Sequence, residues 1–389
     1  MKEIRPLTSL RAIAAFLVFM FHYAEVWSPA NRGVEFAGEW IPFMFLWRQG
    51  DVGVSIFFVL SGFLITRIYY DTLVTGRVPL RRYFVKRIGR IWPLFLVFAL
   101  IQHTTLLAGG STWSRDFLVT MTMTQSFFSG LVFEGLPVAW SLTVEECFYL
   151  LAPLSFVVLA RFLGDAGAES PRLRFSYFLR VVTVLIAVTA AVLAAGLLIV
   201  KVVQTQGWGW RGFMDSNFHM YHSTIFGRFL EFAIGMAAAF VHRGLDLKQI
   251  LRSWRGTAAT LGAAAGIILC MLGKDLLDGE TGALVQAGTY VCSYGLAFFS
   301  GLLILALSVT GGWLHRLLGH GLPVFLGKIS YGFYLIQLTV MMDPLMRFTD
   351  QLGYARLPAL IVLTTLVCAF FYRVVEVPAR RFIVTRWAD

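Results

Sequence analysis

Residues 181–200 read VVTVLIAVTAAVLAAGLLIV, a run of twenty residues without one charged side chain. As a helix rising 1.5 Å per residue, such a run spans about 30 Å, the thickness of the hydrocarbon core of a bilayer. The whole chain has a similar character, because 58% of its 389 residues are hydrophobic and 14% are charged. Ordinary soluble domains carry about 25% charged residues. We therefore predict an all-α, polytopic integral membrane protein.

Ten segments are long and apolar enough to be predicted as transmembrane helices. They lie at about residues 10–28, 52–71, 91–109, 138–160, 178–200, 224–241, 256–273, 288–310, 323–342 and 357–375. No Pro-rich linker or low-complexity tract divides the chain, so residues 1–389 are predicted to form a single membrane-embedded domain.

The distribution of Lys and Arg predicts the orientation, because cytoplasmic loops are enriched in these residues. With a cytoplasmic amino terminus, 21 of the 33 cations fall in cytoplasmic segments, 8 in outer loops and 4 within spans. Both termini are therefore predicted to be cytoplasmic. The net charge of +11 then mostly records topology and contact with the lipid bilayer, and it indicates no nucleic-acid partner. The four Cys show no metal-binding or disulfide spacing, so no metal site is predicted.

Ionisable residues within a span are costly and mark candidate functional sites. Arg11 and His22 lie eleven residues apart in the first span, which is three helical turns plus about 20°. They therefore share one face of the helix but are about 16 Å apart along its axis. Only a long ligand or a continuous cavity could engage both. The alternative is an arginine that snorkels to the surface and a structural histidine.

The depth of Glu145 suggests a partner for His22. Glu145 lies five residues after Trp140, and His22 lies five residues before Trp27, so both are predicted about 7–8 Å below the outer interface. A carboxylate at that depth could orient the imidazole and raise its basicity. Glu146 points about 100° away from Glu145, so at most one of the two is expected to face the same cavity. A hydrogen-bonded structural glutamate is the alternative.

The densest basic patch, at residues 81–90, contains Arg87 and Arg90. Their i,i+3 spacing lets both guanidinium groups face one phosphate-bearing ligand. The patch also fits a topological signal that meets anionic lipid headgroups, and the two interpretations are compatible. In the sixth span, the i,i+3 spacing of Arg228 and Glu231 predicts a local ion pair.

Seven segments in order resemble acyltransferase family 3, polytopic enzymes that acylate exopolysaccharides, O-antigens and related glycans. Among them are VGVSIFFVLSGFLIT at residues 52–66, RIGRIWP at 87–93 and WSLTVEECFYL at 140–150. The others lie at residues 9–22, 227–232, 329–335 and 375–381. Each segment alone is weak evidence, but together they cover nearly the whole chain.

The resemblance implies a multi-pass O-acyltransferase of the inner (plasma) membrane. It implies a cytoplasmic acyl-CoA donor, acetyl-CoA by default, as a co-substrate rather than a permanently bound cofactor. It also implies a carbohydrate or glycolipid acceptor at the cell surface or in export. His22 and Arg11 match the family's signature pair, and Arg87 and Arg90 match its cytoplasmic Arg-x-x-Arg. The extracytoplasmic hydrolase-like domain of longer members is not expected here, and the oligomeric state stays open.

Two positions depart from the family pattern. Ser55 stands where the second-span motif commonly has an acid, and Gln337 stands where the ninth span often has a histidine. A glutamine can form hydrogen bonds but cannot shuttle a proton. The departure at Gln337 therefore argues against proton transfer by the ninth span and leaves the assignment of His22 unchanged.

The working hypothesis makes His22 the general base on an acceptor hydroxyl, with Glu145 orienting its imidazole. The residues assigned to acyl-CoA binding are Arg11, Arg87 and Arg90. A covalent relay through Ser61 or Tyr331 is a lower-ranked route. Two other classes remain: a proton-coupled transporter that uses His22 and Glu145, and a non-catalytic scaffold of a polysaccharide-export complex.

Overall fold

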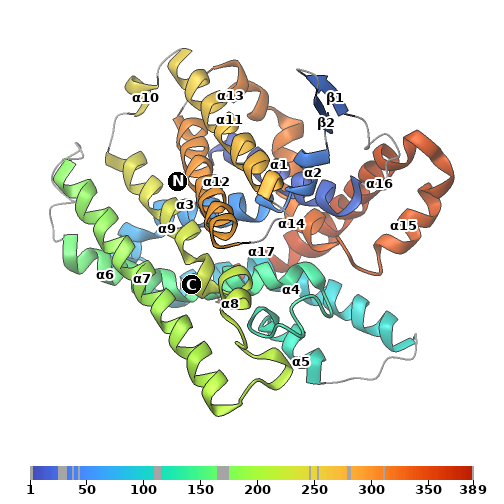
Figure 1. Ribbon diagram of the computed structural model, residues 1–389, viewed down its shortest axis with the longest axis horizontal. Helices are drawn as coiled ribbons and strands as arrows, with labels where there is room; N and C mark the ends of the chain where they lie inside the picture. The colour runs from blue at the N-terminus through green and yellow to red at the C-terminus, as the bar shows by residue number, and fades with distance from the viewer. Residues whose placement is uncertain are drawn as a thin grey trace. The chain divides into compact units, whose positions relative to one another are not determined.

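The computed structural model describes residues 3–24, 33–36, 39–42, 44–108, 115–163, 175–244, 247–251, 254–277, 282–309 and 312–387. Helices make up most of this described part (Figure 1). Among the described residues, nine helices are long and apolar enough to cross a membrane. The predicted all-α polytopic fold is confirmed.

The first half of the chain contains α1 (Arg5–Tyr23), α2 (Met44–Arg48), α3 (Val52–Val74), α4 (Leu80–Ala108), α5 (Arg115–Met121), α6 (Trp140–Leu163), α7 (Phe175–Gln206), α8 (Asn217–Ser223) and α9 (Ile225–Gly244). The second half contains α10 (Leu247–Ile250), α11 (Trp254–Leu277), α12 (Ala283–Val309), α13 (Trp313–Leu318), α14 (Gly321–Leu335), α15 (Met342–Thr349), α16 (Arg356–Phe371) and α17 (Val377–Trp387). A small antiparallel pair, β1 (Gly33–Phe36) and β2 (Glu39–Pro42), places Gly33 opposite Pro42.

The structure differs from the prediction of ten spans at residues 323–342. Helix α14 has 15 residues and ends at Leu335, about 22 Å of helix against a core of about 30 Å. Just beyond it, Leu338 has a φ of 58°. A non-glycine residue in this left-handed region cannot continue a right-handed helix, so the predicted span is cut short.

The helices fall into two compact units. Unit 1 consists of residues Met1–Leu60, Asp246–Gln337 and Met342–Cys368, and unit 2 consists of Ser61–Leu245, Leu338–Met341 and Ala369–Asp389. Helix α3 contributes to both units, because the division falls between Leu60 and Ser61.

In unit 1, α1 is held by close backbone contacts with α14 and with the start of α3. A Cβ atom at Gly327 of α14 would overlap the carbonyl oxygen of Thr8, and one at Gly53 of α3 would overlap that of Ala14. Only glycine permits such a close approach of two backbones. Figure 1 shows α1 beside α14. The glycines therefore fix the position of the helix that carries Arg11 and His22.

We expect Gly327→Ala to destabilise the protein. The added methyl group has no space at Thr8, and over-packing of an interior typically costs about 1–3 kcal/mol. Thermal unfolding of the purified protein in detergent would show a lower Tm. Gly262→Ala on α11 is the matched control, because its Cβ would meet nothing within 4 Å and Ala favours helix over Gly by about 1 kcal/mol. An equal Tm for both variants would contradict this packing role.

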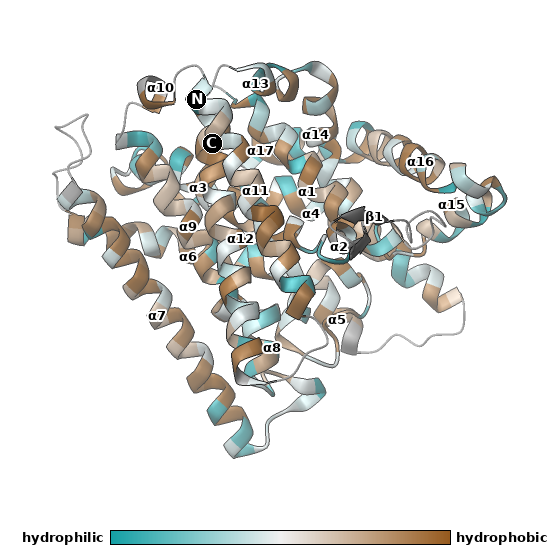
Figure 2. Ribbon diagram, turned by 45° about the horizontal axis from the view of Figure 1, so that its top comes forward, coloured by the Kyte–Doolittle hydropathy of each residue, from teal (hydrophilic) through white to brown (hydrophobic). Residues whose placement is uncertain are grey.

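In unit 2, α7 is apolar along nearly its whole length (Figure 2). Ile186 and Leu198 on this helix remain 59% and 62% exposed, as expected for side chains that face lipid. Its neighbour α9 packs more tightly, because Phe232 of α9 stacks on Phe148 of α6 with ring centroids 4.2 Å apart. At Gly62 of α3, a Cβ would overlap the carbonyl oxygen of Phe232. This close contact holds the part of α3 that contains Ser61 against α9.

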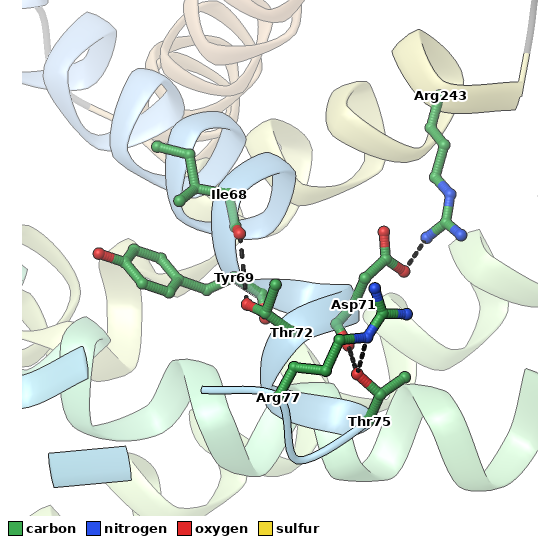
Figure 3. A network of polar contacts seen from close by, with 7 residues as sticks. All are labelled: Ile68, Tyr69, Asp71, Thr72, Thr75, Arg77 and Arg243. Carbon is green, nitrogen blue, oxygen red and sulfur yellow. Dashed lines mark hydrogen bonds and ion pairs between the residues drawn. The ribbon is translucent and has the colours of Figure 1, made fainter. Parts of the chain in front are cut away.

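Charged residues also form ion pairs within unit 2. Arg228 Nε lies 2.9 Å from Glu231 Oε2, which confirms the predicted i,i+3 ion pair. Figure 3 shows Asp71, near the end of α3, paired with Arg243 of α9. The next turn is closed by Thr75, which donates to the Asp71 carbonyl oxygen at 2.6 Å. This pair joins residues 172 positions apart and ties the end of α3 to the end of α9.

Candidate active site

In unit 1, the site begins with His22 in the last turn of α1. Helix α1 is continuous from Arg5 to Tyr23, so Arg11 and His22 lie on one helix, as predicted. Both side chains are half-buried, and the His22 ring lies edge-on to Phe21 with centroids 5.0 Å apart. The imidazole therefore combines a packed position with remaining access, as a general base requires.

Asp51 supplies negative charge near His22. It immediately precedes α3, and its carboxylate is close enough to act electrostatically on the imidazole. Asp51 Oδ2 accepts a hydrogen bond from Lys274 Nζ of α11 at 2.7 Å, while Oδ1 is buried without a hydrogen-bond partner among the described residues. Sequence reasoning missed Asp51. Its position, directly before the motif at residues 52–66, was the signal available.

The positions of Gln337 and Tyr331 bear on their predicted roles. Gln337 is buried, and its amide nitrogen donates to the carbonyl oxygens of Ala15 at 3.3 Å and Phe333 at 3.0 Å. These hydrogen bonds link the end of α14 to α1, so the role of Gln337 is structural. Tyr331 lies on α14 with a side chain that is 9% exposed.

In unit 2, Glu145 forms the centre of a hydrogen-bond network. Its Oε1 accepts hydrogen bonds from Ser61 Oγ of α3 and from the Tyr149 hydroxyl, the latter at 2.5 Å. Ser61 and Glu145 are half-buried, whereas Tyr149 is buried. Glu145 and Tyr149 are one turn apart on α6, so the local helix already places them on the same face.

Arg87 of α4 lies against the same tyrosine. Its guanidinium carbon is 5.6 Å from the centroid of the Tyr149 ring and 5.4 Å from that of Tyr69. Its Nη2 also donates to the Tyr69 hydroxyl at 3.3 Å. Cation–π contact with two rings stabilises the charge and fixes the direction of the guanidinium plane. Tyr83 supports the arrangement by donating to the Tyr149 carbonyl oxygen at 3.0 Å.

Arg87 and Glu145 are thus joined through Tyr149. We call Ser61, Tyr69, Arg87, Glu145 and Tyr149 the Arg87–Glu145 network. The charge of Arg90 reaches Tyr149 electrostatically, so both arginines of the predicted pair belong to the surroundings of this network.

Glu146 differs from its neighbour. Its Oε1 is buried without a hydrogen-bond partner among the described residues, and Arg87 acts on it electrostatically. The two adjacent glutamates therefore have different surroundings, as their angular separation on a helix predicts.

The predicted pairing of His22 with Glu145 joins residues of different units and stays a prediction. Glu145 has Ser61 and Tyr149 as hydrogen-bond partners, and His22 has Asp51 as its neighbouring acid. Trp27, used to estimate the depth of His22, lies outside the described residues.

The fold defines a polytopic membrane protein, and half-buried ionisable groups lie on the helices of each unit. A family model described as an acyltransferase domain matches residues 6–373, and the chain belongs to this family, acyltransferase family 3. The match includes every residue that the sequence assigned to the site.

The curated relatives are longer than this chain. The chain is 23% identical to a provisionally named O-acetyltransferase of Staphylococcus aureus strain COL, over 98% of this chain and 58% of the relative. It is 24% identical to the O-acetyltransferase OatA of S. aureus strain NCTC 8325, over 96% of this chain and 57% of OatA. The chain therefore spans less than two thirds of these relatives. No solved structure shows a significant match.

Proposed function

We propose that this protein is an O-acyltransferase of the plasma membrane. It moves an acyl group, acetyl by default, from cytoplasmic acyl-CoA to a hydroxyl group of an exported carbohydrate or glycolipid. The observation that carries the proposal is the family match over residues 6–373, which spans the helices bearing both His22 and the Arg87–Glu145 network. The names of the relatives, all O-acetyltransferases, support an acetyl group.

In the proposed reaction, the acceptor oxygen attacks the thioester carbon while His22 takes the hydroxyl proton. The carbon–sulfur bond then breaks, CoA leaves as a thiolate, and the proton passes from the imidazolium to the sulfur. Asp51 would support the uptake of the proton by His22, because a nearby carboxylate stabilises the imidazolium. Lys274 holds that carboxylate in place.

Binding of the donor is assigned to arginines, because guanidinium groups form strong, paired hydrogen bonds with phosphate. In the proposal, Arg87, Arg90 and Arg11 bind the nucleotide end of the donor, and the thioester lies near His22. The rings of Tyr69 and Tyr149 support this role for Arg87. A guanidinium whose orientation is already fixed loses less conformational freedom when a ligand binds.

One observation also favours a covalent route through Ser61. Its hydroxyl donates to Glu145, so the carboxylate is placed to take the proton as Ser61 Oγ attacks the thioester. The acyl-serine ester would then pass the acyl group to the acceptor, and CoA would leave in the first step. Peptide mass spectrometry after mixing with acetyl-CoA alone distinguishes the routes, because only the covalent one leaves an acetyl group on Ser61.

The proposed function is tested in cells that carry or lack the gene. Mass spectrometry of their cell-surface glycans should show an acyl ester, with the mass of acetyl, that disappears when the gene is removed. Restoring the gene should restore the ester. The transporter alternative predicts a different result: substrate flux that requires a proton gradient, without a new ester. Identical glycan ester content with and without the gene would overturn the proposal.

A further inference from the structure

A cavity in unit 1 lies apart from the residues assigned to the reaction. Its volume is about 570 Å³, and it is lined by residues before and within the first turn of α1, by α13, and by the turn between α13 and α14. Pockets of about 300–1,000 Å³ are typical for small-molecule ligands. The cavity is therefore much larger than a single ion requires.

The charged side chains of this cavity are mostly basic. Arg5 and Arg316 both line it, and both are exposed. Neither forms an ion pair in the part of the chain that the structure describes. The acidic side chain in the lining is Glu3, and its carboxylate accepts a hydrogen bond from Thr8 at 2.8 Å. The charged lining therefore consists of two positive groups without an ion-pair partner among the described residues and one negative group.

Three further polar residues line the cavity, Ser308, His315 and His320. His320 is exposed and directly precedes α14. Guanidinium groups form strong, paired hydrogen bonds with phosphate oxygens, and an exposed imidazole adds a further donor.

Backbone groups add to this donor set. Helix α14 begins at the cavity and has no side-chain cap on its first turn, so the backbone N–H groups of its first two residues are placed to bind an anion. Helix α1 adds less, because Pro6 has no N–H. The N–H groups of Leu7 and Thr8 donate to the Ile4 carbonyl oxygen at 3.0 and 3.3 Å. Gly321, the first residue of α14, lines the cavity, and a Cβ there would meet nothing within 4 Å. A ligand can therefore approach this backbone closely.

The walls of the cavity are held in position. Ser9 of α1 donates to the carbonyl oxygen of Leu318 in α13 at 2.5 Å, and Gly327 brings α14 against Thr8. These contacts fix α1, α13 and α14 relative to one another. The site is therefore formed before a ligand arrives, which lowers the cost of binding.

We propose that this cavity binds the phosphate groups of a ligand of nucleotide size, with Arg5 and Arg316 as its anchors. In the predicted orientation it lies on the cytoplasmic side, where two sources of such phosphates exist. One is a free nucleotide, bound separately from the donor phosphates that the proposed function assigns to Arg87 and Arg90. The other is the headgroup of an anionic lipid. Neither source depends on the proposed function.

The test measures access to the cavity directly. His320→Cys places a thiol in the lining, and maleimide labelling is followed by peptide mass spectrometry, so the four native Cys are resolved separately. The first arm adds adenosine 3′,5′-bisphosphate to protein in phosphatidylcholine nanodiscs. The second arm adds no nucleotide and replaces part of the phosphatidylcholine with phosphatidylglycerol. Phe348→Cys on α15, 73% exposed in the native chain, is the control position.

A ligand bound in the cavity should slow maleimide labelling at position 320 and leave the labelling rate at position 348 unchanged. Adding Arg5→Gln and Arg316→Gln should raise the probe concentration needed for half protection by about a hundredfold, because each charge-assisted contact is worth about a factor of ten. Arg347→Gln with Arg380→Gln, two exposed arginines away from the cavity, controls for net charge. It should change protection by less than about twofold, the scale of surface effects.

Gly321→Trp provides a test that leaves charge unchanged, because a bulky side chain at the start of α14 would occupy part of the cavity and should weaken protection. Protection in the first arm assigns the nucleotide as the source, and protection in the second arm alone assigns the lipid. Labelling that neither arm slows, or protection equal in the two double variants, overturns the proposal. None of these measurements requires turnover. A protein that binds the probe but transfers no acyl group would therefore contradict the proposed function and leave the phosphate site supported.

Discussion

His22→Ala is expected to reduce acyl transfer by about 10²–10⁴-fold, the usual contribution of a general base. Without the imidazole, the acceptor hydroxyl has to attack the thioester before it loses its proton. The measurement is the rate of CoA thiol release by the purified protein with its acceptor present. Donor binding should change by less than about twofold, because the proposal places His22 at the reacting centre rather than at the phosphates.

His103→Ala is the matched control for this variant. His103 is also half-buried, on α4, and its ring packs edge-on against Phe117 with centroids 4.8 Å apart. Its loss should leave turnover within about threefold, since it removes packing and a structural interaction alone. If His22→Ala retained turnover similar to that of His103→Ala, His22 would have no catalytic role.

Arg87→Lys is expected to raise the donor KM by about tenfold or more, although the positive charge is kept. Lysine lacks the planar fork that pairs with phosphate and that lies between the rings of Tyr69 and Tyr149. Loss of one charge-assisted hydrogen bond is worth about 1.5–3 kcal/mol, and about 1.4 kcal/mol corresponds to a factor of ten in affinity. Steady-state kinetics with varied acyl-CoA measure the change.

Two further variants separate binding from structure. Arg81→Lys alters an exposed arginine of the same basic patch and should leave the donor KM unchanged. Tyr149→Phe keeps the ring beside Arg87 but removes the hydroxyl that donates to Glu145, so it should affect turnover more than donor KM. A lower Tm for Arg87→Lys with an unaltered donor KM would show that Arg87 acts only through packing.

The sequence predicted the membrane fold because transfer of apolar side chains into lipid is a local, additive property of each segment. The span at residues 323–342 was the exception. Helix α14 ends early beside Leu338 and its left-handed φ, and hydropathy carries no information on that conformation. Length and polarity therefore predict where helices lie better than where they end.

The interactions of the candidate site also differ in how far they could be predicted: contacts within one helix follow from its geometry, and contacts between helices do not. Arg228 and Glu231 were predicted because an i,i+3 pair is set by helix geometry. The bond between Tyr149 and Glu145, an i,i+4 pair, was available to the same reasoning and was missed. The contact of Arg87 with Tyr69 could not be found in this way, because it depends on how α3 and α4 pack.

The close packing of α1 restricts which parts of the protein can move during a reaction cycle. Besides the contacts at Thr8 and Ala14, a Cβ at Gly50 would overlap the carbonyl oxygen of Leu17. Neighbouring backbones thus press on α1 at three levels, so it cannot rotate or slide without breaking all three contacts. If His22 serves the proposed reaction, we therefore expect α1 to keep its place against α14 and the start of α3, and the opening that admits an acceptor to come from other helices.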